Sequence, residues 1–189
     1  NLFIQNLINS FGTSVVAGYS AAIKVNTFGI TTFTTLGNAI STYTAQNIGA
    51  GLDNRVKEGH KADSIIGLAV SFVFFIVCFF EGDLLINAFI KESSPEALAT
   101  GVQFLRIVAP FYMIIVFKLI TDGVLRGSGA VKCFMIATFS DLIIRVGLAY
   151  ILSVPYGVTG VWMSWPIGWT VGTVLSVGFY AKGVWKSKV

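Results

Sequence analysis

Four charged residues stand in otherwise apolar stretches of the sequence, as two pairs of opposite sign. Lys118 and Asp122 are four positions apart, and so are Asp141 and Arg145. In a helix this spacing places both members of a pair on one face, where they can form an ion pair. A carboxylate in apolar surroundings can instead bind a proton or another cation and release it when its surroundings change. Both interpretations stay open: two local ion pairs, or a protonation or cation site at Asp122 or Asp141 that Lys118 and Arg145 tune.

The groups that most enzymes use for chemistry do not come together in this sequence. His60 is the only histidine, and Cys78 and Cys133 lie in separate apolar runs without the spacing of metal ligands. The sequence also has no serine nucleophile motif and no phosphate-binding loop. We therefore expect no enzyme activity, no catalytic residue, no metal site and no cofactor, and we expect both cysteines to be buried structural thiols.

The composition is typical of a membrane protein. Hydrophobic residues make up 54% of the 189 positions and charged residues only 12%, whereas soluble domains carry about 25% charged residues. The net charge of +4 comes from basic residues scattered between apolar runs, so nucleic acid is not an expected partner. The chain begins at Asn1 without the features of a signal peptide, which predicts that it is the inner part of a longer protein.

Six segments can cross a bilayer as helices, which takes about 20 residues each, although the first is shortened. They predict an all-α fold, a polytopic transmembrane bundle. The second segment is rich in Thr, Asn and Gly, as in a helix buried among others. Ser94 and Pro95 predict the start of the fourth helix, as its cap and first residue. The predicted spans are about 1–16, 18–48, 62–85, 95–121, 130–153 and 158–181.

Lysine and arginine predict the orientation in the membrane, because short cytoplasmic loops are enriched in them. Three groups of basic residues fall on one side of the predicted bundle, and we place that side in the cytoplasm. The compact loops favour a bacterial plasma membrane, with membrane lipids as partners. The three groups are Arg55, Lys57 and Lys61; Arg126 and Lys132; and Lys182, Lys186 and Lys188.

A segment with two glycines ends the second predicted span. Its glycines can stop the helix, and the amide side chains before them can bind freed backbone groups. The run 45–55 resembles the AQNxGAGxxxR signature of MATE (multidrug and toxin extrusion) transporters. The residues that carry this resemblance are Gln46, Asn47, Gly49, Ala50 and Arg55.

Two further segments resemble the same family. Residues 125–129 resemble its LRGxG turn through Arg126, Gly127 and Gly129, and residues 157–162 resemble its GxxGVW entry to the last helix. The three segments occur in the family's order and spacing, and the resemblance covers nearly the whole chain. Tight turns between packed helices also need glycine, so each glycine taken alone is compatible with a purely structural role.

The resemblance implies that residues 1–189 are the C-terminal lobe of a two-lobe transporter whose N-terminal lobe is missing. It implies secondary active efflux of cationic, amphipathic compounds, exchanged for protons or sodium ions by alternating access. The implied partners are the N-terminal lobe of the same chain and small organic cations, and the implied coupling cation is H⁺ or Na⁺. The cation site of some branches cannot be carried over, because Asp122 stands later in its helix than the family's acid.

Polar residues on the predicted helices are candidates for a substrate pathway. A cavity for an organic cation needs apolar and aromatic walls with a few polar groups that orient the ligand. The same polar side chains can instead bond neighbouring helices to each other. The candidates for the pathway are Asn9, Asn26, Asn38, Tyr43, Tyr112, Lys118, Asp122, Asp141 and Arg145.

Two other functions stay open. A lipid-linked precursor flippase of the same superfamily would line its cavity with several arginines for phosphate groups, and only Arg106 and Arg145 lie inside predicted spans. A non-transporting membrane scaffold subunit would have no polar stripe on its second helix. Asn26, Asn38 and the threonines at 31–35 argue against that alternative.

Overall fold

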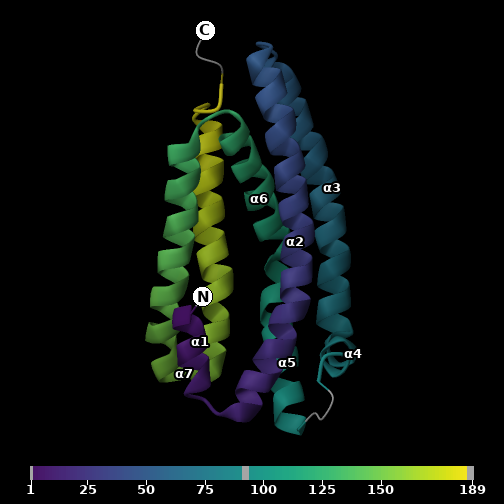
Figure 1. Ribbon diagram of the computed structural model, residues 1–189, viewed down its shortest axis with the longest axis vertical. Helices are drawn as coiled ribbons and strands as arrows, with labels where there is room; N and C mark the ends of the chain where they lie inside the picture. Colours follow the sequence, from purple (N-terminus) through teal and green to yellow (C-terminus); the bar gives the residue numbers. More distant parts are fainter. Residues whose placement is uncertain (1, 91–93, 187–189) are drawn as a thin grey trace.

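The computed structural model describes residues 2–90 and 94–186, and in that range it contains helices and no strand (Figure 1). The all-α prediction is confirmed. Three stretches, Asp53–Phe80, Pro95–Gly127 and Val131–Ala181, are long and apolar enough to cross a membrane. The elements are α1 (Leu2–Asn9), α2 (Thr13–Gly49), α3 (Asp53–Phe80), α4 (Gly82–Asn87), α5 (Pro95–Val108), the 3₁₀ turn η1 (Ala109–Phe111), α6 (Tyr112–Gly127) and α7 (Val131–Ala181).

The helices form one elongated bundle with the connections at its two ends. α2 and α3 run side by side as a long hairpin. The two arms of α7, which lie before and after Gly157, form a second hairpin beside α1, and α5 and α6 lie between the two hairpins (Figure 1). The α2–α3 turn, the α6–α7 turn and the C-terminal segment all lie at the same end (Figure 1). The basic groups of the sequence therefore lie at one end of the bundle, as predicted, although Lys188 lies outside the described residues.

The first break in the chain lies earlier than the sequence predicts. The predicted spans meet near residue 17, but α1 ends at Asn9 and α2 begins at Thr13. Gly12 turns the chain with a φ of 103°, a conformation that side chains with a Cβ rarely adopt. Gly18 is helical and packs against the backbone of α5 at Ala97 and Gly101. The helix therefore breaks at Gly12 and continues through Gly18.

Of the next boundaries, one differs from the predicted spans and two agree with them. α3 starts at Asp53, so Arg55, Lys57 and Lys61 lie on its first turns and the connection from α2 is short. Pro95 begins α5 as predicted, and the Ser94 hydroxyl accepts a hydrogen bond from the Ala97 amide at 3.2 Å. The helical run α7 is interrupted at Gly157 (φ 55°, ψ −138°), where the two predicted spans meet.

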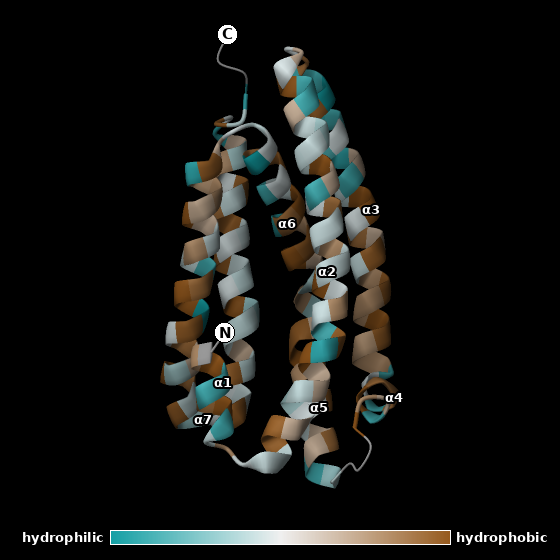
Figure 2. Cartoon of the chain, in the orientation of Figure 1, coloured by the Kyte–Doolittle hydropathy of each residue, from teal (hydrophilic) through white to brown (hydrophobic). Residues whose placement is uncertain are grey.

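The two helices of the long hairpin differ in hydropathy (Figure 2). Most of α3 beyond its polar first turns is hydrophobic, and Ile65, Phe72 and Val73 are exposed, as suits a lipid-facing helix. α2 is longer but is not among the stretches apolar enough to cross a membrane. Its glycines and threonines allow close packing against α5 and α6.

Close backbone contact joins α2 to α6. A Cβ added at Gly37 of α2 would overlap the Leu119 carbonyl, and one at Gly123 of α6 would overlap the Gly37 carbonyl. Gly127 lies equally close to the Ser41 backbone. Small residues of this kind let transmembrane helices approach until their backbones touch. They fix the position of α6 against α2.

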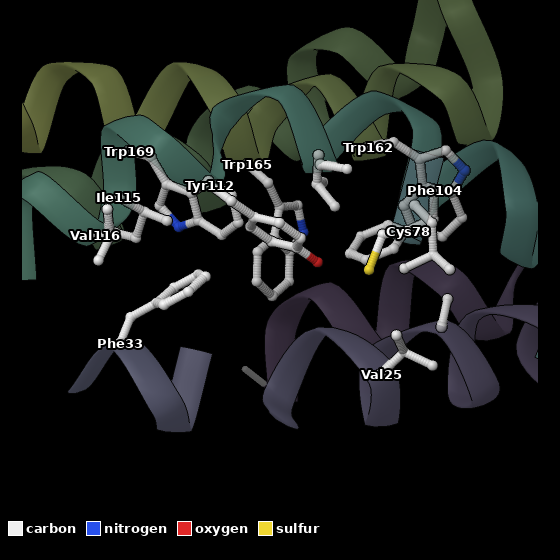
Figure 3. Packing of buried hydrophobic residues seen from close by; sticks show 14 of the residues in the cluster. Val25, Phe33, Cys78, Phe104, Tyr112, Ile115, Val116, Trp162, Trp165 and Trp169 are labelled. Carbon is white, nitrogen blue, oxygen red and sulfur yellow. The ribbon is translucent and has the colours of Figure 1, made fainter. Parts of the chain in front are cut away.

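Aromatic side chains fill the interior between α2, α5, α6 and α7 (Figure 3). Tyr19 stacks on Trp162 with ring centroids 5.2 Å apart, and Phe104 packs edge-on against Trp162 at the same distance. Trp165 and Trp169 continue the row along α7, and Tyr112 lies within 6.2 Å of the Trp169 ring. This packing ends at a polar cavity.

Candidate functional site

A cavity of about 440 Å³ lies between α2, α6 and α7. Its wall combines aliphatic and aromatic side chains with five charged ones, the composition expected of a site for amphipathic ligands. The lining residues are Ile23, Asn26, Thr27, Ile30, Thr34, Ile115, Lys118, Leu119, Asp122, Arg126, Phe134, Thr138, Asp141, Arg145, Trp165 and Trp169.

The first charged pair is a tight ion pair on α6. Lys118 Nζ donates to Asp122 Oδ2 at 2.7 Å, and each side chain is only 3% exposed. Ser176, on the second arm of α7, donates a short hydrogen bond to the other carboxylate oxygen, Oδ1. Both oxygens of Asp122 therefore have a partner inside the protein.

The second charged pair, on the first arm of α7, is held more loosely. Arg145 Nε lies 3.9 Å from Asp141 Oδ1, which is too long for a hydrogen bond, and the two side chains are 13% and 8% exposed. The Arg145 guanidinium stacks over the Trp165 ring at 4.7 Å from the ring centre. Asp141 Oδ1 and Arg145 Nε have no hydrogen-bond partner within the described part of the chain.

Glycines on the second arm of α7 bring the two pairs together. A Cβ at Gly172 would come within 2.5 Å of Lys118 Cε and 3.0 Å of Asp141 Cβ. A Cβ at Gly168 would come within 2.7 Å of Asp141 Oδ1. Only glycine at these two positions leaves room for the charged side chains, so the four predicted residues share one cavity wall.

The remaining pathway candidates separate into those near the cavity and those away from it. Asn26 lines it and accepts a hydrogen bond of 3.1 Å from the hydroxyl of Tyr112, which is fully buried in the aromatic core behind it. Asn38 accepts a bond of 3.0 Å from Arg126, which itself lines the cavity. The other two lie elsewhere: Asn9 is exposed on α1, and Tyr43 packs against Gly59 of α3.

The sequence profile of the MatE family matches residues 1–151. The chain belongs to the MatE family. Two curated relatives from Bacillus subtilis (strain 168) are similar to it: "Probable multidrug resistance protein YpnP", 26% identical over 97% of the chain, and "Probable multidrug resistance protein YoeA", 26% identical over 98%. The chain spans only 41% and 40% of these two proteins.

Solved structures of MATE transporters share the fold. The chain matches an outward-facing multidrug resistance MATE family transporter of the MOP superfamily with a TM-score of 0.90 and 20% identity, over all of this chain and 42% of that one. It matches a MOP superfamily transporter from Pyrococcus furiosus equally well, with a TM-score of 0.90, 20% identity and the same two coverages. The chain is thus a helical membrane protein of a transporter family.

The MatE signature residues mostly shape turns and helix contacts. Asn47 donates to the Tyr43 carbonyl at 2.8 Å, and the Gln46 carbonyl accepts from the Ala50 amide at 3.2 Å. Gly49 ends α2, Gly129 has a φ of 82°, and Gly127 packs on α2. Arg55 lies on the first turns of α3. Of the signature residues, Arg126 alone also lines the cavity.

Sequence reasoning missed several residues of the site. Ser176 gives no local signal, because its partner Asp122 lies 54 positions away. Trp165 and Phe134 contribute aromatic faces to Arg145 and Arg126, at 4.7 and 5.4 Å. Arg126 was predicted as a signature residue and as a basic residue of a cytoplasmic turn, but not as a residue of the cavity. Within the described residues no group of three His, Cys, Asp or Glu side chains could hold a metal ion.

Proposed function

We propose that the chain is one lobe of a secondary active multidrug efflux transporter of a bacterial plasma membrane. It exports amphipathic organic cations in exchange for protons or sodium ions by alternating access. The observation that carries this proposal is the cavity, where two buried carboxylates lie beside tryptophan faces. Carboxylates and aromatic faces are the groups that attract organic cations, and the names of the B. subtilis relatives support the same activity.

Asp141 is the better candidate for ion exchange. Its Oδ1 has no hydrogen-bond partner in the described residues, whereas both oxygens of Asp122 are bound by Lys118 and Ser176. A carboxylate that keeps unused binding capacity beside a cavity can accept a proton or a sodium ion at little structural cost. Asp122 then holds α6 against α7 while Asp141 exchanges its ion.

A second candidate, a lipid-linked precursor flippase, gains support from the charge of the cavity. The sequence placed only Arg106 and Arg145 inside spans, but the Arg106 side chain is 53% exposed and pairs with Asp83. Arg126 and Lys118 line the cavity together with Arg145, which leaves one positive charge in excess over the two carboxylates. An anionic phosphate group would be attracted by that excess.

Ethidium export separates the two candidates. The complete reading frame is expressed in cells that lack their own exporters, and proton and sodium gradients are imposed separately on everted vesicles. The efflux proposal predicts ethidium transport under one of the two gradients and loss of this transport in Asp141→Asn at unchanged expression. No ethidium transport under either gradient would contradict it and bring the flippase forward.

A further inference from the structure

The side chain of Arg145 lies where the charged group of a bound organic cation could lie. Its guanidinium lies over the Trp165 ring at 4.7 Å and beside the Asp141 carboxylate at 3.9 Å, on the wall of the cavity. An aromatic face together with a carboxylate is the combination that proteins use to bind organic cations. The protein's own cation therefore occupies a cation-binding position.

The contacts of Arg145 are weak for an arginine buried with a carboxylate. Such pairs usually form two parallel hydrogen bonds, but here the 3.9 Å separation allows none through Nε. Both Nε of Arg145 and Oδ1 of Asp141 are buried without a partner in the described residues. The Lys118–Asp122 pair beside it closes at 2.7 Å, so the cavity can hold a tight pair.

We propose that Asp141 and Trp165 form the subsite for the charged group of an organic cation, and that Arg145 fills this subsite until the substrate displaces it. This inference rests on the proposed function for the class of substrate. Gly168 supports it, because a side chain there would collide with Asp141 Oδ1. The cavity of about 440 Å³ gives the displaced guanidinium room to move.

Displacement also explains how a cation can bind in a cavity whose net charge is positive. With Arg145 on Asp141, three basic side chains face two acidic ones, and a cation that enters meets net repulsion. When Arg145 leaves, the carboxylate of Asp141 becomes available to the substrate. Bound substrate and bound Arg145 therefore exclude each other at a single site.

The test is the affinity of the purified full-length transporter for tetraphenylphosphonium, measured by calorimetry. Arg145→Gln removes the competitor and is expected to lower the Kd about tenfold. Arg145→Lys keeps the charge without the flat guanidinium that stacks on tryptophan, so its Kd is expected to fall by a smaller factor. Because Arg145→Lys leaves Asp141 with a counter-charge, it still tests the proposal if Arg145→Gln does not fold.

Arg126→Gln is the matched control, because it removes one positive charge from the same cavity without touching Asp141 or Trp165. A similar gain of affinity in Arg126→Gln and Arg145→Gln would overturn the proposal, since it would reflect net charge alone. Unchanged or weaker binding in Arg145→Gln would overturn it as well.

Ethidium export by the wild type separates this failure from failure of the proposed function. If export is normal but Arg145→Gln brings no gain, only the displacement mechanism is wrong. If the wild type neither exports ethidium nor binds tetraphenylphosphonium, and Arg145→Gln does not bind it either, both proposals fail together. Binding that appears only in Arg145→Gln supports displacement.

Discussion

Glycine has opposite structural effects in the contacts of α6 with α2 and of α6 with α7. Against α2, Gly37, Gly123 and Gly127 bring the two backbones together and leave no space between them. Against α7, Gly168 and Gly172 lie opposite Asp141 and Lys118 and make space that charged side chains occupy. We expect the α2–α6 contact to stay fixed. We expect the α6–α7 contact to be a polar interface whose charged side chains can change partners. We therefore expect the α2 face of α6 to contribute to stability alone, and the α7 face to contribute to both stability and transport.

Within the polar interface the two ion pairs also differ. Lys118–Asp122 closes at 2.7 Å with a third partner, whereas Asp141–Arg145 stays 3.9 Å apart. We expect the first pair to behave as a structural element and the second as an exchangeable one. The following predictions test this contrast, in order of their expected effect on stability.

Asp122→Asn is expected to have the largest effect. It leaves the Lys118 ammonium buried without a counter-charge, and breaking a buried pair in this way costs about 3–5 kcal/mol. The thermal unfolding midpoint of the purified protein should fall sharply, with loss of export. The double variant Lys118→Met/Asp122→Leu removes both charges and should regain most of the stability. A midpoint equal to wild type in Asp122→Asn would show that the pair is not structural.

Gly123→Ala should come next. Its Cβ would overlap the Gly37 carbonyl and lie 2.6 Å from Ile40 Cγ2, so α6 must move away from α2. Overpacking of this kind costs about 1–3 kcal/mol. Gly147→Ala is the control, because a Cβ there meets no atom within 4 Å and alanine favours the helix. Equal unfolding midpoints for the two variants would argue against a close, fixed contact between α2 and α6.

Ser176→Ala is expected to cost about 1.5 kcal/mol, since it removes a hydrogen bond to a charged carboxylate. Ser153→Ala, also on α7, removes an exposed bond to the Tyr150 carbonyl and should change the unfolding midpoint little. If the two serine variants unfold at the same temperature, Ser176 does not hold α7 to α6.

Asp141→Asn should have the smallest effect on stability, because its pair with Arg145, although buried, is 3.9 Å long and makes no hydrogen bond through Nε, and Arg145 keeps its contact with the Trp165 ring. Its effect on transport should nevertheless be complete if this carboxylate exchanges the coupling ion. Asp83→Asn, which removes the exposed pair with Arg106, should leave stability and export unchanged. Normal gradient-driven export in Asp141→Asn would contradict the assignment.

Local spacing was enough to find the charged pairs but could not show how they differ. The four-residue separation predicted that Lys118 could meet Asp122 and that Asp141 could meet Arg145. The further partners of each pair lie far along the chain: Ser176 donates to Asp122, and the Trp165 ring stacks on Arg145. Helix packing brings these partners together, and no short-range pattern encodes it.

Local patterns also predicted the helix boundaries only in part. Apolar length, together with Ser94 and Pro95, predicted the helices and the start of α5. The break at Gly12 was missed because Gly12 and Gly18 look similar in the sequence, and no local pattern shows that Gly18 lies inside the helix and packs against α5. Arg126 was identified from a motif, but its place on the cavity wall follows from the close contact between α2 and α6.

The central claim, that substrates pass through the cavity between α2, α6 and α7, is tested most directly by cysteine labelling in the complete transporter. With Cys78 and Cys133 replaced, single cysteines are placed at Thr138 in the cavity wall and at Ile143, which is 69% exposed on the other side of the same arm. The claim predicts that a charged, water-soluble thiol reagent labels position 138 and not 143, and that ethidium protects position 138. Labelling of position 138 that ethidium does not slow, or no labelling there at all, would contradict it.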